Sequence, residues 1–398
     1  MTGRKVYFDN AATTFPKPKG VADAVYEYIE NVGCNINRGS YEGAYAAADT
    51  VFDTRSRLKE LFGAPDERNI IFTPSDTYSL NMLIKGIVKE GDHLLVSSME
   101  HNAVMRPVEA LARKGTVTYD ILECDVSGTV SGVMMREKLE EILLRTKREN
   151  KRFRAVIFNH GSNICGSVLP IEEAGRFCSE HDMFMIADCA QTAGFLDIDM
   201  ERMCLDGLCF SGHKGLMGPQ GTGGFAISDR MAEQLDTLID GGTGSFSHLL
   251  VMPEELPDRF EAGTMNIPGI YGLNAGIRFI EETGTDNIRR HERAILERFY
   301  ENAKDIDGIR FAGGGPDPAV SLPVISVTCE RMDPAELAYR LESEYGIWTR
   351  VGLHCAPVAH KTLGTFPKGT VRFSFGYFNT VEEAEYGAEA IRSICERG

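Results

Sequence analysis

Hydrophobic and polar positions follow two alternating patterns between about Lys19 and Asp236. Short apolar runs predict buried strands, and stretches with apolar residues three or four positions apart predict the helices between them. The predicted strands are Asn69–Thr73, His93–Ser97, Thr116–Tyr119, Arg154–Asn159, Met183–Ala187, Gly207–Phe210 and Gly223–Ile227, and the predicted helices include Tyr78–Val88 and Ile171–His181. This alternation predicts an α/β fold whose mainly parallel sheet is covered by helices on both faces.

A passage rich in glycine and proline, from Asp240 to Pro257, ends the alternation. The segments predicted beyond it are the helices Tyr271–Glu282 and Arg289–Asp305 and the strands Leu322–Val327, Gly346–Arg350 and Val371–Ser374. We therefore expect a large domain at residues 16–258 and a smaller α+β domain at residues 259–398, which residues 1–15 join. In such folds ligands bind at the carboxyl ends of the parallel strands, so the chemistry is expected in strand-to-helix loops.

Composition and charge narrow the class of protein. The chain has 398 residues, 43% hydrophobic and 25% charged, which is typical of a globular chain of roughly two domains and excludes disordered or collagen-like chains. Lysine and arginine number 42 against 58 aspartates and glutamates, and this net charge of −16 disfavours binding to nucleic acid or to an anionic membrane. No apolar run is long enough to span a bilayer or to form a signal peptide, so we expect a cytoplasmic protein.

Cysteine usage predicts reduced thiols. The 10 cysteines are scattered through a long chain and include no Cys-x-x-Cys pair, which is typical neither of a disulfide scaffold nor of a zinc ribbon. We therefore predict no metal site.

Lys214 is the first candidate catalytic residue. It follows Ser211, Gly212 and His213, in a loop after a predicted strand that is too rich in glycine for a helix. A lysine held in a crowded pocket has a lowered pKa and can form a Schiff base, whereas a lone lysine is more often an exposed surface residue.

Asp188 and Gln191 stand where a ring cofactor could meet them. Asp188 ends the strand Met183–Ala187, and a carboxylate there can keep a pyridine nitrogen protonated; the alternative is an N-cap. Gln191 could hydrogen-bond an oxygen on the ring.

His101, just past another strand, could stack on a flat cofactor and move protons, although a structural histidine is the alternative.

A phosphate cradle is predicted where the strand Asn69–Thr73 gives way to a helix. Thr77 supplies a hydroxyl and the helix start supplies backbone N–H groups, although an ordinary capped helix has the same pattern. A carboxylate beside a phosphate repels it, so we expect the side chain of Asp76 to point away.

Two further candidates lie near the C-terminus. Cys355 follows His354, and a cysteine near cationic groups becomes a nucleophilic thiolate more readily; the alternative is a buried, inert thiol. Arg372 lies within a strand bounded by aromatic residues, where its planar fork suits a carboxylate, either of a ligand or of a structural ion pair.

In this order, the motifs resemble the fold-type I pyridoxal-phosphate (PLP) enzymes of the class V aminotransferase family, and within it the SUF-type cysteine desulfurases. The likeness covers nearly the whole chain. The motifs that carry it are Asp9-Asn-Ala-Ala-Thr-Thr14, Glu100-His-Asn102, Ser162-Asn163, Ala187-Asp188 with Ala190-Gln191, Phe210-Ser-Gly-His-Lys214, Phe260-Glu-Ala-Gly-Thr264, Arg350-Val-Gly-Leu-His-Cys-Ala356, Val371-Arg372 and Asn379-Thr380.

The resemblance implies a role for each matching residue. Those expected at the cofactor ring are Lys214, joined covalently to PLP, Asp188 at the pyridinium, His101 stacked on the ring and Gln191 at its phenolic oxygen. Those expected at the phosphate are Thr77, Ser211 and His213, with Thr264 from a neighbouring subunit. Those expected at the substrate are Asn10, Asn163, Arg350 and Arg372, with Asn163 also near the cofactor, Arg372 at the substrate carboxylate and Cys355 as the sulfur acceptor.

The resemblance thus implies a homodimeric PLP-dependent cysteine desulfurase that converts L-cysteine to L-alanine. Cys355 would carry the sulfur as a persulfide to an acceptor or scaffold protein, as in iron–sulfur cluster assembly. Selenocysteine lyase, C–S lyase and aminotransferase activities remain alternatives, as does a sulfur-relay or regulatory partner that keeps the fold. A dinucleotide-binding oxidoreductase is disfavoured because no G-x-G-x-x-G follows the early strands.

Overall fold

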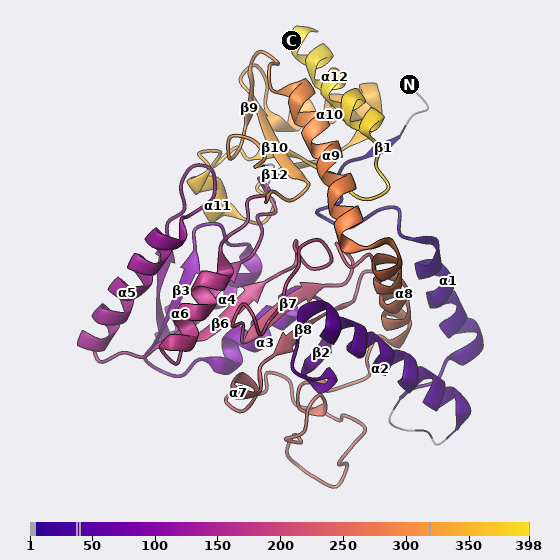
Figure 1. Ribbon diagram of the computed structural model, residues 1–398, viewed down its shortest axis with the longest axis vertical. Coiled ribbons are helices and arrows are strands. Elements are labelled where there is room, and N and C mark those ends of the chain that lie inside the picture. The colour runs from indigo at the N-terminus through magenta and orange to yellow at the C-terminus, as the bar shows by residue number, and fades with distance from the viewer. Residues whose placement is uncertain (1–4, 37–38, 40, 318–319, 398) are drawn as a thin grey trace.

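A central sheet forms the middle of the computed structural model, which describes residues 5–36, 39, 41–317 and 320–397 (Figure 1). The strand order is β2-β8-β7-β6-β5-β3-β4, and every neighbouring pair is parallel except the two that involve β8. The strands are β2 (Ile70–Thr73), β3 (Asp92–Ser97), β4 (Val117–Leu122), β5 (Phe153–Asn159), β6 (Phe184–Asp188), β7 (Gly207–Ser211) and β8 (Gly223–Ile227). The predicted mainly parallel sheet is confirmed.

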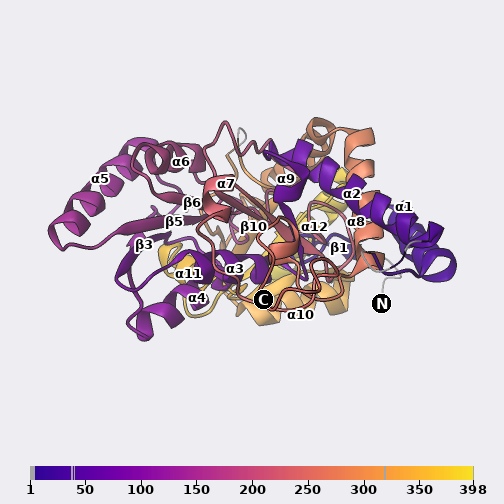
Figure 2. The same ribbon diagram turned by 90° about the horizontal axis from the view of Figure 1, so that it is seen from below.

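Helices cover both faces of this sheet, as Figure 2 shows from below. Helices α3 and α4 pack on one face, and α2, α5 and α6 on the other. The helices of this part are α1 (Lys19–Glu27), α2 (Glu42–Phe62), α3 (Asp76–Ile87), α4 (Asn102–Arg113), α5 (Gly132–Arg148), α6 (Ile171–Glu180) and α7 (Asp229–Ala232). Strand β5 shows why both faces are covered, because Ala155 and Ile157 enter one apolar cluster and Val156 and Phe158 the other.

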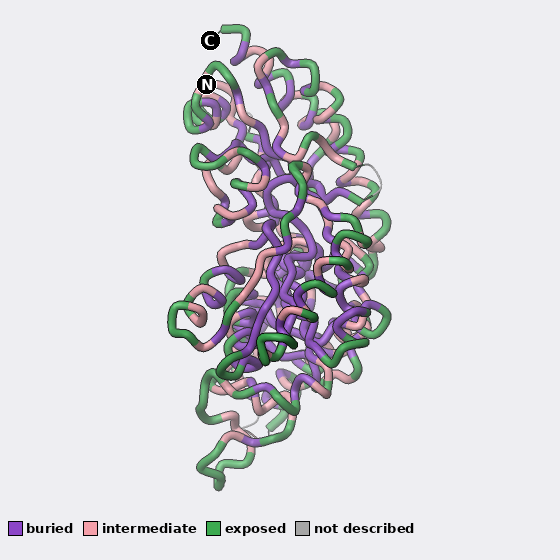
Figure 3. The backbone as a smooth tube through the Cα atoms, turned by 90° about the vertical axis from the view of Figure 1, so that its left-hand side faces the viewer, coloured by how far each residue is buried: buried purple, intermediate pink, exposed green. Residues whose placement is uncertain are grey.

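A smaller antiparallel sheet lies above the first, at the top of Figure 1, in the order β12-β13-β10-β9. Its strands are β9 (Ile309–Phe311), β10 (Val324–Cys329), β12 (Arg350–Gly352) and β13 (Thr370–Ser374), and the remaining helices are α8 (Ile267–Thr283), α9 (Thr285–Ala303), α10 (Pro334–Tyr345), α11 (Pro357–Thr362) and α12 (Val381–Arg397). Figure 3 shows buried backbone running through both sheets, while exposed positions lie on the outer helices and loops.

The N-terminal segment belongs with the smaller sheet. Strand β1 (Val6–Tyr7) pairs in parallel with β11 (Ile347–Trp348), and Asp9 bridges to Ser374. Phe8 is fully buried against the aromatic rings of β13 and the residue after it. Helix α8, by contrast, packs on α1 and α2, so the division of the chain at residue 258 stays a prediction.

Most predicted strands differ from the observed ones only in their end residues, as at β4 and β6, but at two near the C-terminus the difference has a structural reason. The strand predicted at Gly346–Arg350 is wrong, because the chain leaves one sheet after β11 and enters the other at β12; hydrophobic alternation over a few residues does not report a change of partner. Strand β10 begins at Val324 instead of Leu322, because Pro323 has no N–H to donate to the ladder. No helix in the described part of the chain is long and apolar enough to cross a membrane.

Candidate active site

The loop that carries Lys214 is crowded. It runs between β7 and β8 without a helix, as predicted, and closes on itself through Gly212 N–H to the Thr222 carbonyl at 3.0 Å. A Cβ on Gly212 would lie 2.2 Å from the Thr222 hydroxyl oxygen, and one on Gly215 would lie 2.3 Å from the Ala193 carbonyl oxygen. Burial of the amine lowers the pKa of Lys214, and the nearby carboxylates of Asp76 and Asp188 only partly oppose the shift.

Lys214 faces a cavity of about 100 Å³ at the carboxyl ends of β5, β6 and β7. The lining residues that the sequence predicted are Thr77, His101, Asn163, Asp188, Gln191, Ser211, His213 and Lys214. Those that it did not predict are Ser75, Asp76, Asn159, Gly161 and Ala190. The cavity therefore gathers eight of the predicted site residues from segments up to 137 positions apart, the separation of Thr77 and Lys214 (214 − 77).

Asp188 lines the cavity and also bonds to the backbone just after it. It is the last residue of β6 and is buried, and its Oδ1 accepts the N–H of Ala190 at 3.0 Å. No helix begins there, so Asp188 is not an N-cap. Its carboxyl group also lines the cavity that contains Lys214. Burial raises the pKa of Asp188, and the positive charge of Lys214 opposes that rise.

His101 caps helix α4 with its ring. Its Nδ1 accepts the N–H of Ala103 at 3.1 Å, and burial lowers the pKa of His101 to about 4, helped by the positive charge of Lys214. The ring is therefore neutral near pH 7, and because Nδ1 accepts a hydrogen bond, the single ring proton is on Nε2. His101 thus offers the cavity a hydrogen-bond donor and a flat apolar face.

The start of helix α3 closes the opposite end of the cavity. Ser75 caps the helix, and Thr77, Ser211 and His213 line the same space. The Nδ1 atom of His213 is buried without a hydrogen-bond partner. A Cβ on Gly223 would lie 2.8 Å from the backbone nitrogen of Asp76, so only glycine lets β8 approach the helix start this closely.

The expectation that Asp76 points away from this end is wrong. Its side chain lines the cavity, the residue is only 7% exposed, and its Oδ1 has no hydrogen-bond partner. Helix α3 packs on β7 and β8 at this point, so the side chain has no route to solvent. The sequence pattern did not reveal this packing, because the first residue of a helix is usually exposed.

Cys355 lies on a short loop tied to two parts of the cavity wall. The N–H of Asn102, beside His101, donates to the Cys355 carbonyl at 2.8 Å, and the Asn163 amide donates to the His354 carbonyl at 2.9 Å. His354 and Cys355 both have left-handed backbone, with φ of 47° and 59°. The Cys355 side chain is exposed, so the alternative of a buried thiol does not apply to it.

The two arginines pair across β12 and β13 but have different partners. Arg372 is buried; its Nη2 donates to Asp9 Oδ1 at 2.7 Å and its Nη1 to the Asn163 carbonyl at 3.0 Å, which leaves its buried Nε without a partner. For Arg350, no carboxylate of the described residues lies within ion-pairing distance. Asp9, for which no role was predicted, stands in the Asp-Asn-Ala-Ala-Thr-Thr motif.

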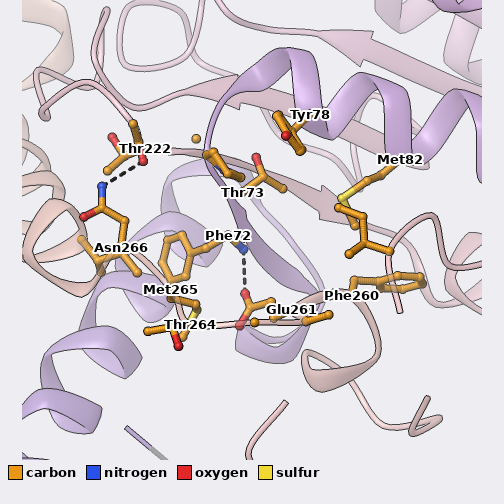
Figure 4. Close-up of a pocket in the computed structure, with 17 residues that line it drawn as sticks. Phe72, Thr73, Tyr78, Met82, Thr222, Phe260, Glu261, Thr264, Met265 and Asn266 are labelled. Carbon is orange, nitrogen blue, oxygen red and sulfur yellow. Dashed lines mark hydrogen bonds between the residues drawn. The ribbon is translucent and has the colours of Figure 1, made fainter. Parts of the chain in front are cut away.

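Five predicted residues lie outside this cavity of about 100 Å³: Arg350, Cys355 and Arg372, described above, and Asn10 and Thr264. Asn10 lines a small neighbouring pocket with Lys214 and Gln191. The Asn10 amide donates to the Ser374 carbonyl and to Asn379, and its oxygen accepts the N–H of Phe15, so its role toward substrate stays a prediction. Thr264 lines a second, larger cavity of about 230 Å³, whose wall includes Phe72, Glu261 and residues of α3 (Figure 4). Its role, which the resemblance assigns to a neighbouring subunit, also stays a prediction.

The wall of this second cavity contains a buried ion pair. Glu261 accepts the Phe72 N–H at 2.7 Å (Figure 4) and pairs with Arg55 at 2.5 Å, and both side chains are buried. We expect Glu261→Gln to lower the free energy of unfolding by about 3 kcal/mol, because the Arg55 charge then stays buried without a counter-charge.

Urea denaturation measures this loss, with Glu281→Gln as the matched control. Glu281 pairs with Arg57, also on α2, but both side chains reach solvent, so its loss is expected to cost less than about 1 kcal/mol. Equal effects of the two changes would contradict the importance of the buried pair.

Comparisons with known proteins identify the family of the chain. The family model described as aminotransferase class-V matches residues 6–386. A probable cysteine desulfurase of Methanothermobacter thermautotrophicus is 31% identical over 397 residues, 99% of this chain and 95% of that protein, and one of Pyrococcus abyssi is 32% identical over 390 residues, 97% and 93% of the two chains.

Solved structures agree as well. The apo structure of a cysteine desulfurase from Thermococcus onnurineus NA1 has a TM-score of 0.89 at 30% identity and covers 99% of this chain and 95% of its own. A cysteine desulfurase from Escherichia coli, at 24% identity and a TM-score of 0.85, shares the fold. The fold-type I architecture is confirmed, and the chain belongs to the class V aminotransferase family, in the branch that holds the cysteine desulfurases.

Proposed function

We propose that the protein is a PLP-dependent cysteine desulfurase, which removes the sulfur of L-cysteine and releases L-alanine. The observation that carries the proposal is that Lys214 and Asp188 line one cavity whose wall is hydrogen-bonded to the loop of an exposed cysteine, Cys355. The probable cysteine desulfurases that are similar to this chain along nearly its whole length support it.

The residues of the cavity fit PLP. Lys214 is a crowded amine of lowered pKa, Asp188 is a buried carboxylate, and the unpartnered Nδ1 of His213 lies near a helix start able to meet a phosphate. When bound, PLP supplies the electron sink that makes the substrate Cα–H acidic. Lys214 would bind PLP covalently, and Asp188 would pair with its ring nitrogen. Thr77, Ser211 and His213 would bind its phosphate.

Lys214 is the group we assign to moving the proton. The single ring proton of neutral His101 is on Nε2, so the ring has no free basic nitrogen toward the cavity, because Nδ1 is engaged by Ala103. The amine of Lys214, freed when substrate binds, has a pKa that burial lowers, so more of it is the neutral base that can accept a proton. His101 then orients the reacting groups.

Cys355 is the group we assign to accepting the sulfur. As a thiolate it attacks the substrate sulfur; a sulfur–sulfur bond forms while the carbon–sulfur bond breaks, and the three-carbon remainder takes up a proton and leaves as alanine. Cys355 becomes a persulfide in this step. Arg350, which has no carboxylate of the described residues within ion-pairing distance, and the unpartnered Nε–H of Arg372 are the groups we assign to the substrate carboxylate.

The partners and location follow as parts of the same proposal. The persulfide would pass to a thiol acceptor or scaffold protein, as in iron–sulfur cluster assembly, because the short loop of the exposed Cys355 cannot carry it far. A cytoplasmic homodimer in which Thr264 reaches the neighbouring subunit's phosphate site fits its position outside the chain's own Lys214 cavity.

Incubation with L-cysteine and a reductant tests the proposal. We expect sulfide and alanine in equal amounts, since each turnover releases one of each. Pyruvate with ammonia would instead identify a C–S lyase, alanine that appears only with a keto acid an aminotransferase, and turnover restricted to selenocysteine a selenocysteine lyase. No turnover in PLP-loaded protein would favour a sulfur-relay partner.

A further inference from the structure

Asp76 is the one carboxylate of the cavity wall that the proposed reaction does not use. It is the first residue of α3, is 7% exposed, and faces the space that Thr77, Ser211 and His213 also line. Its Oδ1 is buried without a hydrogen-bond partner. Burying a carboxylate without a hydrogen-bond partner costs free energy, so the position of Asp76 indicates a partner on a ligand that binds in the cavity.

The charges around Asp76 determine whether its carboxyl group is protonated or ionised when the cofactor is bound. Facing it are Asp188 at the end of β6, Lys214 and His213 after β7, and His101 at the start of α4. The two histidines are neutral near pH 7, because burial lowers the pKa of each to about 4. Lys214 is thus the only lysine or arginine among the residues that line this cavity.

A phosphate dianion would add two negative charges to this wall. Asp188 is needed as a carboxylate opposite a protonated ring nitrogen, and Lys214 is committed to the aldehyde end of the cofactor. An ionised Asp76 would then face the phosphate with no cation between them. In a buried site the repulsion between these negative charges would oppose binding of the cofactor. Burial and the neighbouring Asp188 already raise the pKa of Asp76 well above its ordinary value.

We propose that Asp76 is a positioning residue of the cofactor site that carries a proton when the phosphate is bound, so that its carboxylic O–H is a hydrogen-bond donor at the start of α3. This inference rests on the proposed function. Such a proton makes the affinity for PLP depend on pH. Once the pH exceeds the value at which Asp76 ionises in the free protein, binding of PLP requires uptake of one proton. The affinity then falls by up to tenfold per pH unit.

The test compares PLP with pyridoxal, which has a hydroxyl in place of the phosphate. Dissociation constants are measured by equilibrium dialysis from about pH 7.5 to about pH 10, where the phosphate is a dianion throughout because its second pKa is about 6. Effects on the Lys214 amine are common to both ligands and cancel in the ratio of the PLP to the pyridoxal dissociation constant. For the wild-type protein we expect this ratio to rise by at least about tenfold with pH.

Two variants isolate Asp76. Asp76→Asn keeps the size of the side chain without its charge, and Asp76→Thr supplies a neutral hydroxyl, so the test survives the failure of one of them to fold. In both we expect the ratio to stay constant with pH. Infrared difference spectra of PLP-loaded wild type minus Asp76→Asn are expected to contain the carbonyl stretch of a protonated carboxylic acid.

Three outcomes separate the possibilities. The same pH dependence in wild type and variants, or no carboxylic acid band, overturns the inference while leaving the proposed function intact. Selective loss of PLP affinity at about pH 7.5 in both variants also overturns it, because both variants keep a neutral hydrogen-bond donor at this position. Failure of PLP and pyridoxal to link to the wild-type protein at any pH contradicts the proposed function, and the inference falls with it.

Discussion

Replacing Lys214 by alanine is expected to abolish the covalent attachment of PLP and to lower turnover of L-cysteine by more than roughly a thousandfold. Lys214 is the only amine that lines the cavity shared with Asp188, so its loss removes both the attachment point and the group assigned to the proton. The purified variant should lack the visible absorbance of an attached cofactor. Absorbance spectra of wild type and variant after loading with PLP measure this directly.

Lys17 provides the matched control. Its Nζ donates to the His213 carbonyl at 2.6 Å, and burial lowers the pKa of Lys17 to about 8, so it is a second reactive amine close to the same loop. Lys17→Ala is expected to keep the attached cofactor. Loss of attachment in Lys17→Ala, together with its retention in Lys214→Ala, would contradict the assignment.

Replacing Cys355 by alanine has the second largest expected effect. We expect sulfide production from L-cysteine to fall by at least about a hundredfold while cofactor attachment stays as in wild type, because the thiol acts only after substrate is bound. The side chain is exposed, so stability should change by less than about 0.5 kcal/mol. Sulfide assays and thermal unfolding of the same preparation measure both quantities.

Cys204→Ala is the matched control for this variant. Cys204 is also incompletely buried and also has left-handed backbone, with φ of 52°, so the two substitutions make the same chemical and conformational change. It should leave sulfide production unaltered. Equal sulfide production by Cys355→Ala and wild type would exclude a persulfide on Cys355 and favour direct elimination.

Much of the fold could be predicted because its sheet is buried on both faces. Strand β5 is buried along its whole length, and its run Ala155–Phe158 is apolar throughout; such runs stand out against the helices between them. The predictions failed where partner choice, not burial, decided the structure. Ile347 and Arg350 belong to different sheets although two residues alone separate them, and only the three-dimensional arrangement of β1 and β13 determines this.

Part of the candidate site could be predicted from residue chemistry and from position along the chain. Asp188 ends one parallel strand and Lys214 follows another, and the carboxyl ends of parallel strands meet at one edge of a sheet, so the two were expected to lie close together. Asp76 could not be placed, since its burial depends on how α3 packs on β7 and β8. Asp9 was also missed as a partner of Arg372, because 363 positions separate them and no local pattern links the two.

Peptide mapping of the borohydride-reduced, PLP-loaded protein tests whether Lys214 is the amine that binds the cofactor. Reduction fixes the cofactor on whichever amine holds it, and mass spectrometry of the peptides identifies that amine. The account predicts a single pyridoxyl group on Lys214. A pyridoxyl group on Lys17, or none on the loop between β7 and β8, would contradict it.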